Sequence, residues 1–197
     1  MKDNLLRFDT VVAVCALLAS AVAAGAMVYQ TRVIEEQFSA TIWPYLSVDI
    51  YNDEKSVAIH LTNDGVGPAI IRSARLVVDG KAASGWNDLL QPLYDDPSLK
   101  GKGRLSAQSS SVDASDSVRP GESKSLFAIR ATNQQMIETI KKHRVTLEFC
   151  YCSINNRCWN LIDTLGSKTA QLPKPVSTCA VGSAIAAEPL RTHAPKR

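Results

Sequence analysis

The sequence is poor in the residues and motifs that mark most enzymes. Its 197 residues include three histidines. His60 falls in a predicted strand, His143 ends a predicted helix and His193 lies near the C-terminus. We find no GxSxG, HExxH, phosphate-binding or dinucleotide-binding glycine motif. We therefore predict a non-catalytic protein with no cofactor and no metal site.

An excess of charge of one sign is also lacking. The chain has 22 Lys and Arg residues against 19 Asp and Glu residues, a net charge of +3. Nucleic-acid-binding domains carry a clustered basic face, so this balance excludes nucleic acid as a partner. A composition of 45% hydrophobic and 21% charged residues likewise excludes a disordered or collagen-like chain.

Charged residues are absent between Asp9 and Arg32. The segment 10–29 is almost wholly apolar, and twenty helical residues span about 30 Å, the thickness of the hydrocarbon core. We predict a transmembrane helix at 10–29, preceded by a short N-terminus at 1–9. A juxtamembrane helix is expected to continue through 30–42.

Two properties of this segment stay open at the sequence level. The Ala-Gly-Ala sequence at 24–26 has the form of a signal-peptidase site, so cleavage after Ala26 is the alternative to a retained anchor. The apolar run is longer than a signal peptide needs, which favours a signal-anchor. Lys2 and Arg7 precede the span and only Arg32 follows it closely, so the positive-inside rule leaves the N-terminus in the cytoplasm and exports the rest.

Small residues recur within the span at four-residue spacing. Ala16, Ser20 and Ala24 would lie on one helix face, and such faces let two helices approach closely. This pattern favours a homo-oligomer or a place in a membrane protein complex. Chance spacing in an alanine-rich span is the alternative.

After Trp43-Pro44 the apolar periodicity changes from helical to alternating, which is typical of strands with one buried face. We expect an exported domain at 43–165 with about seven strands and two short helices. The strands are expected near Leu105 and at 45–51, 56–62, 69–80, 125–129, 145–153 and 158–163, and the helices at 85–95 and 132–143. Because no alternating β-α-β pattern is present, the predicted fold is mainly β, an antiparallel Ig-like β-sandwich after the transmembrane helix.

Three segments are expected to be irregular. Residues 96–121 are rich in Ser, Gly, Lys and Asp and predict a long mobile loop, and residues 166–197 predict a flexible tail. A sharp glycine loop at 63–68 is built from Asn63, Gly65, Gly67 and Pro68. The glycine loop and the 96–121 loop are the candidate binding surfaces.

The cysteines of the exported part indicate disulfides. A three-residue turn at 154–156, with Asn156 in the left-handed conformation, places Cys152 opposite Cys158 in a hairpin. Opposed Cβ atoms are close enough for a disulfide, and disulfides require an oxidising compartment. Cys150 points the same way and is the candidate partner of Cys179, although four cysteines allow three pairings.

Two interpretations that give these cysteines a chemical role, as redox-active thiols or as metal ligands, remain as alternatives. Cys150 and Cys152 form a CxC pair of the kind that a thiol/disulfide enzyme uses, but a strand does not lower a thiol pKa as a helix N-terminus does. A metal site would need paired ligands at zinc-site spacing, which the sequence does not provide.

Two motifs carry a resemblance to a group of uncharacterised bacterial single-span membrane proteins with an exported β-sandwich domain. An Asn-x-Gly-x-Gly-Pro-Ala loop matches 63–69, and a Tyr-Cys-Ser…Cys-Trp hairpin matches 151–159. The similarity covers about residues 10–165. It implies a bacterial inner-membrane protein with its C-terminal domain in the periplasm, and it implies no activity. The chain lacks the acidic residue expected before the second cysteine, so no role for that acid is carried over.

These observations together predict a membrane-anchored, non-catalytic interaction or accessory module of the bacterial envelope. Its expected partner is an envelope protein or a glycan. A thiol/disulfide enzyme using Cys150 and Cys152, and a subunit of a membrane complex, are the two alternatives.

Overall fold

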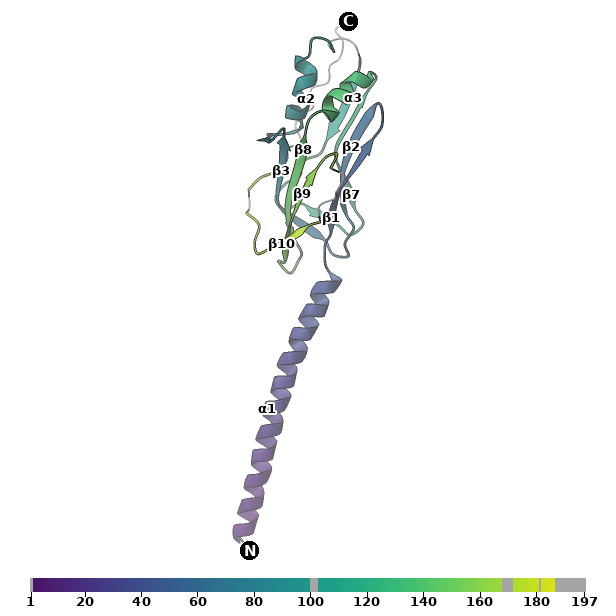
Figure 1. Cartoon of the computed structure of the whole chain (residues 1–197). Helices are drawn as coiled ribbons and strands as arrows, with labels where there is room; N and C mark the ends of the chain where they lie inside the picture. The colour runs from purple at the N-terminus through teal and green to yellow at the C-terminus, as the bar shows by residue number, and fades with distance from the viewer. Residues whose placement is uncertain (1, 100–102, 168–171, 181, 187–197) are drawn as a thin grey trace. The chain divides into compact units, whose positions relative to one another are not determined.

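The computed structural model describes residues 2–99, 103–167, 172–180 and 182–186. The chain divides into two compact units, Met1–Thr41 and Ile42–Arg197. The first is a single helix, α1 (Lys2–Thr41), which runs without a break through the predicted transmembrane and juxtamembrane segments (Figure 1). Its apolar stretch Thr10–Phe38 is long enough to cross a membrane, and the most apolar window is not buried in protein. These features fit a membrane anchor or a signal sequence.

The second unit is a β-sandwich of two antiparallel sheets, which confirms the predicted fold class. The first sheet has the strand order β1 (Leu46–Asn52), β2 (Ser56–Asn63), β7 (Ser123–Ala131), β5 (Leu105–Ser109). The second has the order β10 (Lys174–Val176), β9 (Cys158–Thr164), β8 (Val145–Cys152), β3 (Ala69–Val78), β4 (Lys81–Ala82), with β6 (Ser117–Val118) paired to β3.

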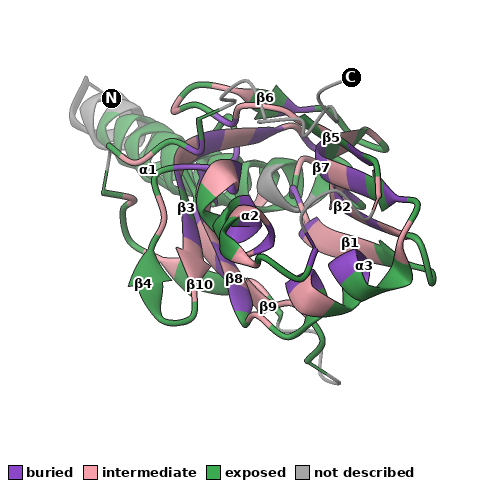
Figure 2. Ribbon diagram, turned by 90° about the horizontal axis from the view of Figure 1, so that it is seen from above, coloured by how far each residue is buried: buried purple, intermediate pink, exposed green. Residues whose placement is uncertain are grey.

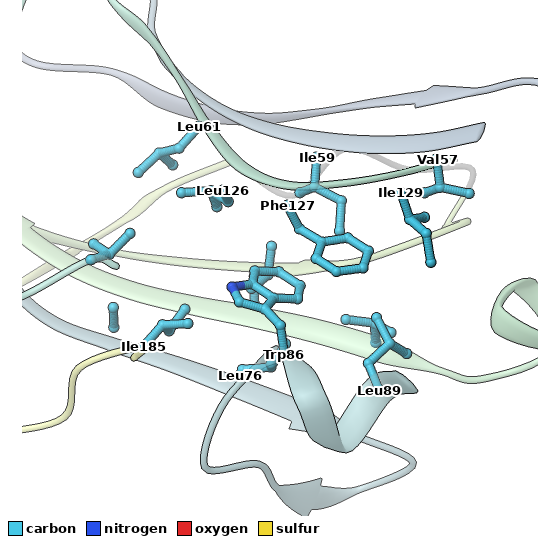
Figure 3. Packing of buried hydrophobic residues seen from close by; sticks show 14 of the residues in the cluster. Val57, Ile59, Leu61, Leu76, Trp86, Leu89, Leu126, Phe127, Ile129 and Ile185 are labelled. Carbon is cyan, nitrogen blue, oxygen red and sulfur yellow. The ribbon is translucent and has the colours of Figure 1, made fainter. Parts of the chain in front are cut away.

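The core lies between the two sheets and follows the alternation in the sequence. In β2 every second residue is buried, namely Val57, Ile59 and Leu61, because successive side chains point to opposite faces of a strand. The Trp86 ring stacks on the Phe127 ring in the middle of this core, with the ring centroids 4.8 Å apart (Figure 3). Each large apolar side chain buried in this way stabilises the fold by about 1.5–3 kcal/mol.

Two short helices contact each other at one end of the sandwich (Figures 1 and 2). They are α2 (Trp86–Asp95) and α3 (Gln134–Lys141), within the two predicted ranges. Met136, Ile137 and Ile140 form the buried face of α3. Asn133 is the N-cap and its side chain accepts from the Gln135 N–H, while the Thr132 hydroxyl accepts from the Arg104 N–H at 2.9 Å.

The segment 96–121 is more ordered than predicted. β5 confirms the strand expected near Leu105, but β6 was not predicted, and Val112 between them is buried. Apolar residues are sparse there, but Leu105, Val112 and Val118 each fill a place in the core. Isolated core residues produce no periodicity, which is why the sequence pattern missed this order. Residues 100–102 lie outside the described part.

The predicted flexible tail at 166–197 is also wrong where it is described. Residues 172–180 and 182–186, here called the strap, run along the second sheet. β10 pairs with β9, and Ile185 is buried with both its N–H and its C=O bonded to Val112. The sequence did not predict β10, because a strand of three residues shows no alternation. Pro175 is tolerated there because β10 is an edge strand. The remaining tail positions, 168–171, 181 and 187–197, lie outside the described residues.

Candidate functional site

The β8–β9 hairpin has the predicted register. Cys152 lies opposite Cys158, Tyr151 opposite Trp159, and Asn156 takes a left-handed φ of 56°. The Ser153 N–H donates to the Arg157 C=O at 2.8 Å and closes the turn. The hairpin thus presents the two cysteines to each other, and the structure contains the Cys152–Cys158 disulfide.

The inner face of this hairpin ties the two sheets together. Tyr151 is fully buried and stacks on Trp159 with centroids 5.8 Å apart. The Leu46 N–H of β1 donates to the Tyr151 hydroxyl at 3.3 Å. Burial raises the pKa of Tyr151 to about 12, because the charged phenolate would lose its hydration. Tyr151 therefore stays neutral and serves as a core residue.

A second disulfide joins Cys150 to Cys179 and fastens the strap to the outer face of the second sheet. Cys179 was the candidate partner of Cys150 among the three possible pairings. The two disulfides are neighbours, since the Cys152 Sγ lies 3.7 Å from the Cys179 Sγ. The arrangement does not contain a Cys150–Cys152 bond, because each of these residues is paired elsewhere.

The sulfur atoms of Cys152, Cys158 and Cys179 lie within 4.8 Å of one another, the spacing of a metal site. Metal binding needs thiolates, and sulfur atoms in disulfides are not thiolates. The oxidised cluster therefore offers no metal ligands. Cys15 is the free cysteine within the described residues and is exposed on α1.

The strap encloses a polar recess against the outer face of the second sheet. The recess has a volume of about 230 Å³, and its lining includes Ser73, Asn160 and Thr178. Arg75 and Glu148 also line it and form an ion pair at 3.6 Å. Hydroxyl, amide and charged groups in one recess suit a polar ligand. Sequence patterns did not indicate this recess, because it depends on the packing of the strap.

The glycine loop at 63–68 packs against the start of the sandwich. Asn63 is fully buried, and its amide makes four hydrogen bonds. The nitrogen donates to the Gly67 and Val118 carbonyls at 2.9 Å each. The oxygen accepts from the Tyr45 and Gly65 N–H groups at 3.1 and 3.0 Å.

Close backbone approach explains both glycines of this loop. A Cβ on Gly65 would lie 2.5 Å from the Trp43 C=O, and a Cβ on Gly67 would clash with the Ile42 C=O. The Asp64 and Val66 N–H groups donate to the carbonyls of the same Ile42–Tyr45 segment. The residues of the candidate binding loop thus have a structural role, and Val66 at 65% exposure is its accessible part. Binding by this loop stays a prediction.

A cavity of about 210 Å³ opens between the two sheets at the end that carries the helices. Its lining is mostly apolar side chains. Those from β1, β2, β7, β8, α2 and α3 are Ile50, Val57, Ile59, Leu89, Phe127, Ile140 and Val145, and Leu165 comes from the segment after β9. The other lining residues are Asn52, Lys141, His143 and Gly166, here called the rim because all but His143 are exposed. Sequence reasoning missed this cavity, because its walls come from six separate elements that only the fold brings together.

Hydrogen bonds hold the cationic rim in place. The Lys141 Nζ donates to the Asp53 C=O at 2.8 Å, joining α3 to the β1–β2 turn. His143 Nδ1 lies 2.6 Å from the Asp79 carboxylate, which also accepts from the Arg144 N–H. The hydrogen bond to His143 is the main cause that lowers the pKa of Asp79.

The small residues of α1 are exposed along the helix. The Ser20 hydroxyl donates to the Ala16 C=O at 2.8 Å, so it is satisfied within its own helix. Helix association through Ala16, Ser20 and Ala24 stays a prediction. The same holds for the orientation of α1 in a membrane.

Comparison of the chain with models of protein families, with curated proteins and with solved structures finds no match. The resemblance to bacterial single-span membrane proteins therefore stays a prediction. The function of the chain is therefore inferred from its own residues.

Proposed function

We propose that the protein is a non-catalytic binding module of the bacterial envelope, anchored in the inner membrane by α1. The observation that carries this proposal is the state of its cysteines: the four in the sandwich form two disulfides, while α1 exposes an apolar stretch of 29 residues. Disulfides persist in oxidising compartments such as the periplasm. A domain of this kind belongs on the exported side of its anchor.

The charges around the anchor give the proposed orientation. Lys2 and Arg7 precede the predicted span at 10–29, and Arg32 is the one basic residue that follows it closely. The positive-inside rule keeps the more basic flank in the cytoplasm. We place the N-terminus in the cytoplasm and the sandwich in the periplasm.

The contacts of the described histidines support a binding role over catalysis. His143 pairs with Asp79, and His60 packs edge-on against the Tyr51 ring. Neither contact is a nucleophile–base arrangement. The recess under the strap instead offers hydroxyl, amide and charged groups, which suit an envelope glycan or a polar protein surface.

Site-specific photo-crosslinking in intact cells tests this proposal. A photoreactive residue replaces Val66 in the glycine loop or Thr178 at the recess, and the matched control position is Lys55, at the other end of β2. We expect one discrete adduct from Val66 or Thr178 and none from Lys55. Identical background labelling at all three positions would contradict a binding module. A periplasmic reporter fused after residue 186 checks the orientation.

Thiol–disulfide exchange is a second candidate function, favoured by the 3.7 Å between the sulfurs of Cys152 and Cys179. A thiolate of an envelope dithiol protein would attack Cys158, forming a mixed disulfide and releasing the Cys152 thiolate. That thiolate would attack Cys179, forming Cys152–Cys179 and releasing the Cys150 thiolate. The second thiol of the partner would then resolve the mixed disulfide, so the partner loses two electrons and the chain gains two thiols, Cys150 and Cys158.

Peptide mapping after mild reduction distinguishes this candidate. Exchange predicts a species with a Cys152–Cys179 bond and alkylated Cys150 and Cys158. A purely structural pair of disulfides predicts resistance to the reductant, or loss of bonds with no new pairing.

A further inference from the structure

The apolar cavity between the sheets has the properties of a ligand site. We infer that it binds the alkyl end of a fatty carboxylate, with the carboxylate held at Lys141. This inference goes beyond the proposed binding module, because the cavity shares no lining residue with the recess under the strap. It rests on cavity size, lining and rim charge.

The size and lining of the cavity suit one alkyl chain end. An apolar cavity of about 150 Å³ stays dry and binds a benzene-sized molecule. The present cavity of about 210 Å³ is larger, but it is below the ~300–1,000 Å³ of sites that enclose a whole drug-sized ligand. Its walls include Ile59, Phe127 and Val145, all buried, which would gain dispersion contacts from an alkyl chain. A polar ligand would lose hydrogen bonds there.

The charge at the rim selects an anionic head group. Among the residues that line the cavity, Lys141 and His143 are the ionisable ones, and no carboxylate side chain lines it. His143 is already paired with Asp79. Lys141 uses one of its three N–H donors on the Asp53 C=O, which leaves donors for a ligand. A carboxylate is the simplest acceptor that would also offset the ammonium charge.

The placement of Lys141 follows from the helix that carries it. Ile140 contributes to the apolar wall, and Lys141, the next residue of α3, lies at the rim. The hydrogen bond from Lys141 to the Asp53 C=O holds its ammonium at the β1–β2 turn. One helix thus supplies both the apolar wall and the cation that a fatty carboxylate needs, while the neighbouring Lys142 does not line the cavity.

The test uses the full chain in phospholipid nanodiscs with ¹³C-labelled Ile, Leu and Val methyl groups. Octanoate, octanol and octylammonium are titrated below their micellar concentrations. We expect saturable octanoate shifts at Ile59, Val145 and Leu165, with octanoate binding about tenfold more tightly than octanol because of one charge-assisted hydrogen bond. Octylammonium should bind most weakly.

Variants separate site binding from partitioning into lipid. Lys141→Gln should weaken octanoate binding about tenfold, whereas Lys142→Gln, its matched control, should leave binding unchanged. Ile140→Phe should fill the cavity and abolish binding of octanoate and octanol alike, with the methyl spectrum reporting on folding. Lys141 is exposed, so its variant keeps the test valid if Ile140→Phe does not fold.

Three results would overturn the inference. Shifts that do not saturate would indicate partitioning, and equal effects of the two lysine variants would remove the role of Lys141. Equal binding of octanoate and octanol would point to a neutral occupant, such as an apolar side chain of a protein partner. None of these results bears on crosslinking from Val66 or Thr178, so a failure here is distinguishable from a failure of the proposed envelope module.

Discussion

The buried side chain of Asn63 holds the backbone of Tyr45, whose N–H donates to the amide oxygen at 3.1 Å. Eighteen residues separate the two in the sequence. The same amide also bonds the Gly67 and Val118 carbonyls, so one side chain fixes the first strand, the glycine loop and β6. The polypeptide entering the sandwich is thereby fastened immediately before β1.

Asn63→Ala should destabilise the sandwich by about 3 kcal/mol or more. The variant removes four hydrogen bonds and leaves buried backbone groups unpaired, each costing about 1–3 kcal/mol less any relaxation. Chemical denaturation of the full chain in detergent, followed by near-UV circular dichroism, measures the change. The control Asn52→Ala, at an exposed position, should stay within about 0.5 kcal/mol of wild type. Equal stabilities of the two variants would contradict the role of Asn63.

Gly67→Ala should loosen the same region by a different mechanism. The added Cβ would meet the backbone of Ile42, which is not the end of a flexible side chain and so has to move. We expect new protease cleavage around Ile42–Tyr45, with the rest of the sandwich intact. The helical control Gly25→Ala has nothing within 4 Å of its Cβ and should show the wild-type digestion pattern. Cleavage unchanged in Gly67→Ala would show that the packing is looser than described.

The parts of the fold that the sequence predicted are those with local signals. The β8–β9 hairpin is one case, because Asn156, the two cysteines and the alternation around them lie within a few residues and fix one register. The helix at 85–95 is another. The contact of Val112 with Ile185 has no such signal, because it joins two irregular segments 73 residues apart through single buried side chains.

The candidate sites differ in the same way. The Asn63–Pro68 motif was visible as turn chemistry, but alternation cannot show that its glycines face the Ile42–Tyr45 backbone. Of the cavity rim, the sequence indicated only that His143 ends a helix. Its lining depends on how the ends of two sheets meet, which single-sequence patterns do not encode.

Removing either disulfide should lower stability, and the disulfide that closes the longer loop should contribute more. The Cys150–Cys179 bond spans 29 residues and the Cys152–Cys158 bond spans six. Chain-entropy arguments give about 3–4 kcal/mol for the first and about 2 kcal/mol for the second. Thermal or urea unfolding of the two double Cys→Ser variants measures this order. A larger loss from Cys152→Ser/Cys158→Ser would show that hairpin packing outweighs tethering of the strap.

Two aspartates should change stability with pH in opposite directions. The hydrogen bond from Lys124 lowers the pKa of Asp116, so its stabilising effect is present above the unfolded value near 3.8 and is lost as pH falls through the folded pKa. Burial raises the pKa of Asp163, so its charged form costs stability as pH rises above that value. At pH 7 Asp116→Asn should therefore be less stable than wild type by under about 1 kcal/mol, because the ion pair is partly exposed, and Asp163→Asn should be more stable.

Unfolding measured from pH 7 down to pH 3 separates these two effects. Both differences from wild type should shrink toward acid. The Asp163 carboxyl loses its charge first, and the advantage of the charged Asp116 declines as the unfolded chain becomes protonated near pH 3.8. A difference that stays constant over this range would mean that packing, not ionisation, causes it.

Trp86→Phe should lower the free energy of unfolding by less than the size of the deleted ring suggests. Trp86 is fully buried against Phe127, yet its indole N–H has no hydrogen-bond partner among the described residues. Replacing it with phenylalanine removes packing area but also removes a buried donor whose desolvation costs about 1–3 kcal/mol. We expect a loss under about 2 kcal/mol for Trp86→Phe, against about 3–5 kcal/mol for Trp86→Ala, in urea unfolding. Similar losses for the two variants would indicate that the indole N–H is bonded after all, because its removal would then cost a hydrogen bond in both.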